Sequence, residues 1–259
     1  MIPIKDYPGP RRSLPWVTWG IIAINIAVFV YQVSLGSNVD EFMFAYAVVP
    51  AALTHGIPQT ELLKSTTAIP FHTPGYVYLT VITSMFLHAG ILHIAGNMLF
   101  LFIFGDNVED RMGHLLFLLF YVFCGIIASL AQVFVDPNST VPSLGASGAI
   151  AGVLAAYLVL FPFAGVRTVI FIFIFFTVVT VPAIFLIGFW FLLQLFNGYT
   201  ALAHVQQGMG GVAYIAHVGG FVTGLLITLL GRPWLKPPPA PISYPSYPRH
   251  PQSASRNQW

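Results

Sequence analysis

Charged residues are scarce in this chain: they make up 7% of its 259 residues. Soluble globular proteins carry about 25% charged residues, so this scarcity excludes an ordinary water-soluble fold. Hydrophobic residues reach 57%. They come in long unbroken runs rather than in alternation with polar residues, which excludes a membrane β-barrel. The composition therefore predicts an all-α protein that crosses a membrane several times.

Cysteine occurs once, as Cys124, so an internal disulfide is impossible and we interpret this residue as packing. The ten basic residues are scattered and the net charge is only +2, so we expect no nucleic-acid partner. No Cys, Asp or Glu accompanies His88 and His93 in their apolar run, and a spacing of five positions puts the two on different sides of a helix. We therefore expect no metal site and no cofactor.

The apolar runs predict six membrane spans, each bounded by polar residues, proline or glycine. The predicted spans are residues 14–35, 90–104, 113–135, 143–161, 181–196 and 211–230, with a charged turn at residues 106–111 between the second and third. Residues 1–13 form an N-terminal segment, residues 14–231 form the bundle, and residues 232–259 form a disordered proline-rich tail.

Two further segments are expected to lie in the membrane interface. Residues 168–196 are too long for one span and too short for two, and Pro182 divides them. We expect an interfacial or re-entrant piece up to Thr180, followed by the fifth span. Residues 42–53, in the long loop before the second span, are also expected at the interface.

Six spans place both termini on one side of the membrane. With that side cytoplasmic, only Lys64 among the basic residues lies outside. The cytoplasmic cations would be Lys5, Arg11, Arg12, Arg111, Arg167, Arg232, Lys236, Arg249 and Arg256. Because cytoplasmic loops are enriched in Lys and Arg, we predict that both termini are cytoplasmic.

Polar side chains gather at one depth in the three even-numbered spans. The second span begins near His88 and His93, with Asn97 one turn after His93; Ser147 begins the fourth, and His217 lies early in the sixth. These spans all enter the membrane from the outside, so the side chains share a level just below the outer surface. Polar groups inside a membrane are costly and mark functional sites.

Small residues allow the fourth and sixth spans to pack closely. The fourth span carries two neighbouring stripes, and the sixth carries one: Ser147, Ala151 and Ala155; Gly148, Gly152 and Ala156; and Ala213, His217, Gly220 and Gly224. Such stripes are also typical of ordinary helix packing, but a close crossing would bring Ser147 within reach of His217. No Asp or Glu lies inside a predicted span, which favours a Ser–His dyad over a triad.

These residues resemble the motifs of the rhomboid family of intramembrane serine proteases. The resemblance covers residues 14–231 and is carried by Gly145-Ala146-Ser147-Gly148, by Ala216-His217-Val218-Gly219-Gly220-Phe221, by His88, His93 and Asn97, and by the turn at residues 104–113. It implies a six-transmembrane-helix rhomboid bundle. Ser147 would be the nucleophile and His217 the general base, with His93, Asn97 and the Ser147 backbone N–H as oxyanion donors.

The same resemblance implies supporting roles for His88, Gly145 and Ala146, and a gate and cap formed by residues 181–196 and 197–210. The family cleaves single-span membrane proteins near their outer membrane boundary, which makes such proteins and the lipid bilayer the expected partners. A bacterial inner membrane is the implied location. Some members carry a tyrosine that stacks on the histidine, where this chain has Ala151, so the group that orients His217 stays open.

Two alternatives come from other classes of protein. A catalytically silent rhomboid-like protein would bind membrane helices without cutting them, but such proteins typically lack the serine or the histidine that this chain keeps. A transporter would be expected to show internal repeats and charged residues at mid-membrane, and neither is evident.

Overall fold

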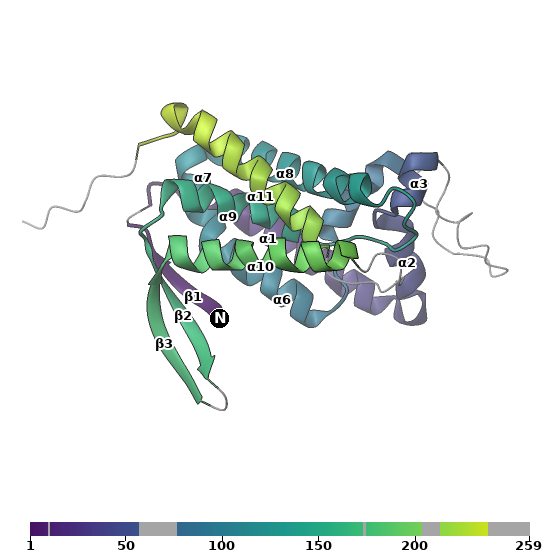
Figure 1. Ribbon diagram of the computed structural model, residues 1–259, viewed down its shortest axis with the longest axis horizontal. Coiled ribbons are helices and arrows are strands. Elements are labelled where there is room, and N and C mark those ends of the chain that lie inside the picture. Colours follow the sequence, from purple (N-terminus) through teal and green to yellow (C-terminus); the bar gives the residue numbers. More distant parts are fainter. Residues whose placement is uncertain (10, 57–76, 173–174, 204–212, 238–259) are drawn as a thin grey trace, which may run out of the picture.

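The computed structural model describes residues 1–9, 11–56, 77–172, 175–203 and 213–237. Its body is a bundle of helices that run along the long dimension of the molecule (Figure 1). Five segments are long and apolar enough to cross a membrane: α1 (Trp16–Ser34), a continuous helix over Ile91–Met112, α8 (His114–Val135), α10 (Ala183–Ala203) and α11 (Tyr214–Gly231). The predicted helical membrane bundle is confirmed. The number six stays a prediction, because α9 (Ser147–Leu160) has 14 residues where a span needs about 20.

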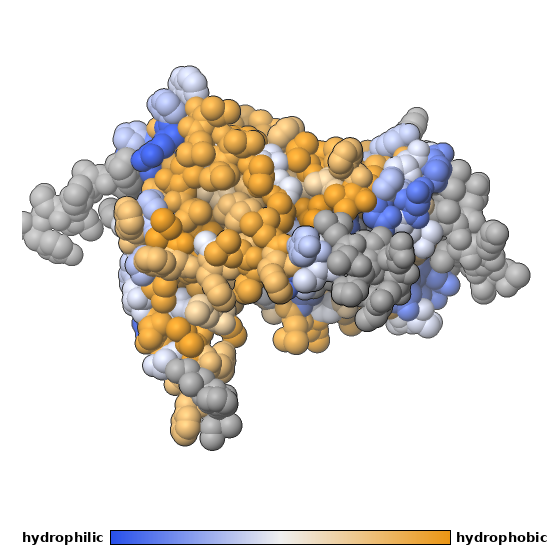
Figure 2. Space-filling view, in the orientation of Figure 1, coloured by the Kyte–Doolittle hydropathy of each residue, from blue (hydrophilic) through white to orange (hydrophobic). Residues whose placement is uncertain are grey.

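Helix α9 forms the centre of the bundle, and nearly all of its residues are buried. It packs against α8, α10 and α11, which turn apolar side chains such as Phe185 and Leu192 outward. Figure 2 shows the resulting apolar belt across the middle of this face of the molecule, with polar residues towards its ends. A helix that is apolar on all sides fits a position enclosed by other helices.

Glycines bring α9 and α11 into backbone contact. A Cβ atom added at Gly220 would lie 2.0 Å from the Gly148 carbonyl oxygen, and one at Gly224 would lie 2.4 Å from the Gly152 oxygen. Of the stripes expected from the sequence, it is therefore Gly148 and Gly152 that face α11. Small residues allow this approach because no side chain separates the two backbones.

The second membrane helix is longer than predicted. It comprises α6 (Ile91–Phe100), a π-helical turn η4 (Leu101–Gly105) and α7 (Asp106–Met112). The predicted charged turn at residues 106–111 is wrong: these residues are helical, and the chain turns at Gly113, whose φ of 84° favours glycine.

The acidic residues of α7 hold the beginning of the chain. The fully buried Glu109 carboxylate accepts hydrogen bonds from the backbone N–H groups of Val17 (3.0 Å) and Thr18 (2.8 Å) in the first turn of α1. Asp110 accepts from the N–H of Arg12 at 2.9 Å. Because the N–H groups of Val17 and Thr18 lack partners in the first turn of α1, Glu109 of α7 acts as the N-terminal cap of α1.

A three-stranded antiparallel sheet replaces the expected interfacial or re-entrant piece before the fifth span. Its order is β1 (Ile2–Tyr7), β2 (Gly165–Ile172) and β3 (Phe175–Pro182). It leaves one end of the bundle and runs across the bundle axis (Figure 1). Val, Ile, Phe and Thr dominate β2 and β3, and these residues favour strands over helices.

Short helices at the opposite end complete the fold. They are η1 (Gly36–Asn38), α2 (Val39–Tyr46), α3 (Pro50–His55), η2 (Val77–Leu79), α5 (Thr80–Thr83) and η3 (Ser84–Phe86), and η6 (Arg232–Trp234) follows α11. The expected interfacial segment 42–53 is mostly helical. The expected disordered tail, residues 232–259, begins with the three helical residues of η6. Its residues beyond 237 and part of the expected cap, residues 204–210, lie outside the described residues.

Candidate active site

The chain brings Ser147 and His217 together between two neighbouring helices. Ser147 is the first residue of α9 and His217 lies near the beginning of α11. Ser147 Oγ lies 2.7 Å from His217 Nε2, and the His217 side chain is buried. The glycine packing of α9 on α11 allows this contact, since a close crossing brings the short Ser147 side chain within reach of the His217 ring. This is the geometry of a serine next to a base.

Gln194 of α10 binds the other side of the same imidazole ring. Its Oε1 lies 2.8 Å from His217 Nδ1, and its Nε2 donates to the Trp190 carbonyl at 3.3 Å. Because an amide oxygen can only accept, Nδ1 must carry the proton in the neutral ring, which leaves Nε2 to accept from Ser147. Gln194 is thus the partner that the sequence left open for His217.

Sequence reasoning missed Gln194, although a signal was present. It is the only glutamine in the apolar run 183–196, and a polar side chain in such a run is a candidate for function. Trp190 and Phe191, on the same helix, also contact α11: the Trp190 ring lies 5.9 Å from the His217 ring, and Phe191 stacks on Phe221 at 4.0 Å. Helix α10 therefore contacts α11 through both polar and aromatic side chains.

His93 and Asn97 of α6 lie beside the backbone that precedes Ser147. A Cβ atom added at Gly145 would lie 2.9 Å from His93 Nε2 and 3.8 Å from Asn97 Nδ2. Gly145 also has a φ of 121°, so both its space and its backbone conformation require glycine. Ala146, fully buried, follows and leads into α9. Gly145 and Ala146 thus shape the approach to Ser147.

Three N–H donors lie along the backbone from Gly145 to Ser147. The buried Asn97 Nδ2 has no hydrogen-bond partner among the described residues. The Ala89 N–H donates to His93 Nδ1 at 3.4 Å, which leaves the proton of the neutral ring on Nε2, the atom that faces Gly145. Ser147 opens α9, where backbone N–H groups lack helical partners. Donors without partners near a serine are suited to an oxyanion.

His88 lies behind His93 rather than beside the serine. It is 1% exposed, and its ring makes an edge contact with the His93 ring at 5.1 Å. Gln32 of α1 holds its backbone from both sides: Gln32 Oε1 accepts from the His88 N–H, and Gln32 Nε2 donates to its carbonyl. Within the described ranges, no group of three His, Cys, Asp or Glu residues could hold a metal ion.

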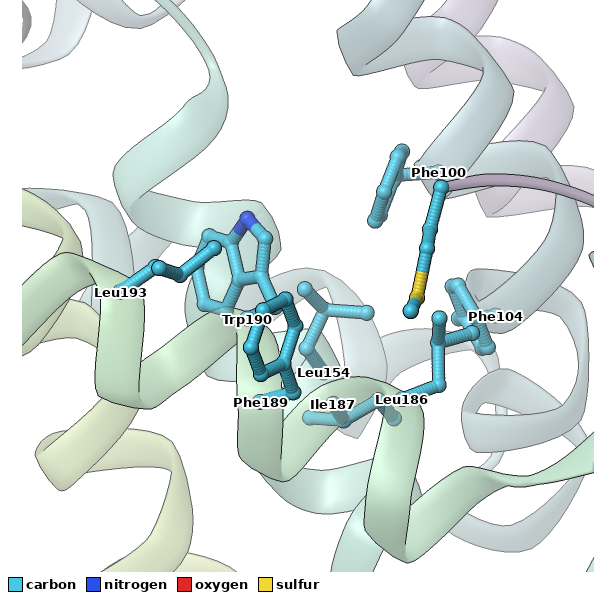
Figure 3. Close-up of a pocket in the computed structure, with 9 residues that line it drawn as sticks. Phe100, Phe104, Leu154, Leu186, Ile187, Phe189, Trp190 and Leu193 are labelled. Carbon is cyan, nitrogen blue, oxygen red and sulfur yellow. The ribbon is translucent and has the colours of Figure 1, made fainter. Parts of the chain in front are cut away.

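An apolar cavity of about 100 Å³ lies between α10 and the second membrane helix. Figure 3 shows Trp190 and Leu193 of α10 facing Phe100 and Phe104 of the second helix across it. Leu154 of α9 and Met1 also line the cavity. Trp190 links the cavity to the serine–histidine pair, because its ring is also close to that of His217.

The fold and this site define an integral membrane protein with a buried serine–histidine pair and N–H donors between its helices. Residues 76–234 match the family model of the Rhomboid domain, more than half of the chain. The chain belongs to the rhomboid family. The match begins after the first membrane helix, whereas the resemblance of the motifs was expected over residues 14–231.

Relatives come from bacteria and from organelles. The chain is 33% identical over 149 residues to rhomboid protease GluP of Bacillus subtilis. This match covers 57% of the chain and 25% of the relative. It is 32% identical to rhomboid protein 1, mitochondrial, of Saccharomyces cerevisiae (57% and 40% covered) and 29% identical to rhomboid-like protein 11, chloroplastic, of Arabidopsis thaliana (58% and 44%). The chain thus spans less than half the length of these relatives.

Proposed function

We propose that this chain is an intramembrane serine endopeptidase that uses a Ser147–His217 dyad. The observation that carries the proposal is the 2.7 Å contact between Ser147 Oγ and His217 Nε2, in a ring whose other nitrogen faces Gln194. Membership in the rhomboid family, with a Bacillus relative that is named a protease, supports the same activity.

In the first half of the reaction, Ser147 Oγ attacks the scissile carbonyl carbon and its proton passes to His217 Nε2. The tetrahedral oxyanion receives N–H donors from His93 Nε2, Asn97 Nδ2 and the Ser147 backbone. His217 then gives the proton to the leaving amine, which releases one product and leaves an acyl-serine. Water, activated by the same ring, hydrolyses that ester and restores Ser147. No cofactor is required by this sequence of steps.

The substrates would be single-span membrane proteins, cut near their outer membrane boundary. An intact helix engages its carbonyl groups in hydrogen bonds, so the scissile segment must unwind before Ser147 can attack. The apolar cavity beside Trp190 fits an apolar side chain of an entering helix, and α10 would act as the gate. Substrates with Gly or Pro near the cut site should therefore be favoured, since these residues weaken helices.

We further propose that both termini lie on the cytoplasmic side of a bacterial inner membrane. Contacts that gather the cations at one end of the bundle support this orientation: Arg11 pairs with Asp106 at 2.5 Å, and Arg111 Nε donates to the Lys236 carbonyl. The positively charged end is the one that stays inside. In a chloroplast or mitochondrion the corresponding side would be the stroma or the matrix.

The test is cleavage of a single-span model substrate in liposomes by the wild type, Ser147→Ala and His217→Ala. Only the wild type should cut, and only the wild type should be labelled by a fluorophosphonate. Equal cleavage by Ser147→Ala would overturn the proposal. A wild type that binds the substrate without cutting it would instead favour the catalytically silent, helix-binding alternative.

A further inference from the structure

The outer face of the three-stranded sheet changes in character along its strands. Directly paired residues share a face. The row nearest the bundle consists of Lys5, Arg167 and Thr180. The next row consists of Ile2, Val169 and Val178, and the last consists of Phe171 and Phe176. On the inner face, Val166 is fully buried against the bundle. The outer face thus runs from two cations to two aromatic rings.

The two cations at the base of the sheet are direct cross-strand neighbours. Lys5 and Arg167 are both exposed, and neither forms an ion pair with an acidic group in the part of the chain that the structure describes. The Lys5 ammonium lies 5.4 Å from the centre of the Tyr7 ring. Like charges directly opposite each other destabilise a sheet. An anion bound between them would remove that penalty.

The far end of the sheet is apolar and open. Phe171 is 58% exposed, Phe175 73% and Phe176 72%. In water such a patch would promote association. Figure 2 shows that apolar residues continue from the bundle onto the sheet, so the lipid-facing belt extends to these side chains.

The dimensions of the sheet suit the boundary between lipid head groups and acyl chains. Arg167 and Phe171 are four positions apart, about 13 Å along a strand. Because the strands run across the bundle axis and their tips lean towards the middle of the bundle, only part of this distance is depth in the membrane (Figure 1). The outer edges of β1 and β3 have no strand partner in the described structure. Their backbone groups need water or head groups, so the sheet cannot lie deep in hydrocarbon. Amphipathic elements at this boundary bury their apolar side by about 5–10 Å.

We propose that this sheet is a binding surface for anionic phospholipids. Lys5 and Arg167 bind the head-group phosphate, and Phe171 and Phe176 enter the acyl layer next to it. The inference requires only that this end of the bundle faces a lipid leaflet. It does not depend on the peptidase activity.

One test measures lipid selectivity with the full chain in bilayers of phosphatidylcholine that contain spin-labelled phosphatidylglycerol or phosphatidylcholine. The wild type should hold the anionic lipid preferentially. The double variant Lys5→Gln/Arg167→Gln should lose most of that preference, by roughly fivefold for each charge. A matched control, Arg232→Gln/Lys236→Gln, removes two exposed cations at the same end and should stay within twofold of the wild type. An equal loss in the control would overturn the proposal.

A second test measures depth and does not rely on those variants. A nitroxide at Phe176→Cys, in a Cys124→Ala background, should be accessible to oxygen and shielded from a water-soluble nickel complex. The same label at Thr180→Cys, beside the cations, should show the opposite ranking. Accessibility of the Phe176 label to nickel would overturn the proposal, and so would direct contact between the labels of two copies.

Discussion

Gln194 holds His217 through a single hydrogen bond, and the contribution of this bond to kcat can be measured. Gln194→Met keeps the size of the side chain but removes the acceptor that keeps the proton on Nδ1. We expect kcat to fall roughly tenfold, the equivalent of one hydrogen bond of about 1.4 kcal/mol, with KM changed less than twofold. Gln194→Glu, which keeps an oxygen acceptor, should retain more activity. Steady-state cleavage of a model substrate tests both, and equal effects on kcat and KM would argue for a packing role.

Asn97 can be tested separately from folding, because its Nδ2 has no hydrogen-bond partner among the described residues. Asn97→Ala should lower kcat by about 10²–10³ through loss of an oxyanion donor. It should not lower the thermal unfolding temperature in detergent, since removal of an unpaired buried donor costs little. A loss of stability that parallels the loss of activity would contradict the assignment.

The sequence indicated Ser147, His217, His93 and Asn97 because helix order and span direction set their common depth. Its signal for Gln194 was weaker, since one amide in an apolar run is a candidate for function but has no spacing pattern that gives its partner. Whether that amide meets His217 depends on how α10 approaches α11, a contact between residues 23 positions apart in the chain.

At the scale of elements, the contact between α9 and α11 leaves no room for a methyl group. Gly220→Ala would place a Cβ 2.0 Å from the Gly148 carbonyl oxygen, and neither backbone can move without shifting Ser147 from His217. We expect a loss of about 1–3 kcal/mol in stability and a large loss of activity. Gly188→Ala in α10 is the matched control, because nothing lies within 4 Å of its added Cβ. The control should resemble the wild type both in its unfolding temperature and in its rate of cleavage.

The attachment of β1 to the bundle should respond to pH. Asp6 accepts hydrogen bonds from Tyr157 (2.6 Å) and Asn107 (2.9 Å), and burial raises the pKa of its carboxyl above the usual value despite the Tyr157 hydrogen bond. A carboxyl whose pKa is raised by folding favours the folded state when protonated, so this contribution is lost as the pH rises from the unfolded pKa through the folded one.

Asp6→Asn removes that titration. The unfolding temperature of Asp6→Asn relative to wild type should therefore rise as the pH increases from about 4 to 7. Unfolding scans across this range measure the difference. A difference that is constant with pH would contradict the raised pKa, whatever its sign.

The sheet also marks the limit of what helical periodicity can predict. Residues 168–196 were compared only with the length of a membrane span, and this comparison predicted an interfacial or re-entrant piece. Their Val, Ile and Phe content, however, is typical of strands. The pairing partner, β1, lies more than 150 residues earlier in the chain. Its two isoleucines, Ile2 and Ile4, are a weak sign of strand structure. Pairing over such a distance leaves no local pattern.

For the whole molecule, the proposed orientation places the charged end of the bundle inside and the active site towards the outside. Alkaline phosphatase, which is active only outside the cytoplasm, should be inactive when fused after residue 237 of a bacterially expressed chain. It should be active when inserted next to Lys64. Activity at both sites, or only at the C-terminal one, would reverse the orientation or change the number of spans.

The π-helical turn at Leu101–Gly105 sets the angular phase between the two ends of one helix. On its α6 side, Asn97 faces Gly145; on its α7 side, Glu109 caps α1. Each residue of a regular helix adds about 100° of rotation. A π-helical turn holds one residue more than an α-helical turn. If the same residues formed a regular α-helix, the phase would change by about 100°, which would rotate Glu109 away from Thr18 or Asn97 away from Gly145. The two contacts therefore depend on the π-helical turn as well as on the residues that make them, and related sequences that keep both contacts should keep this spacing.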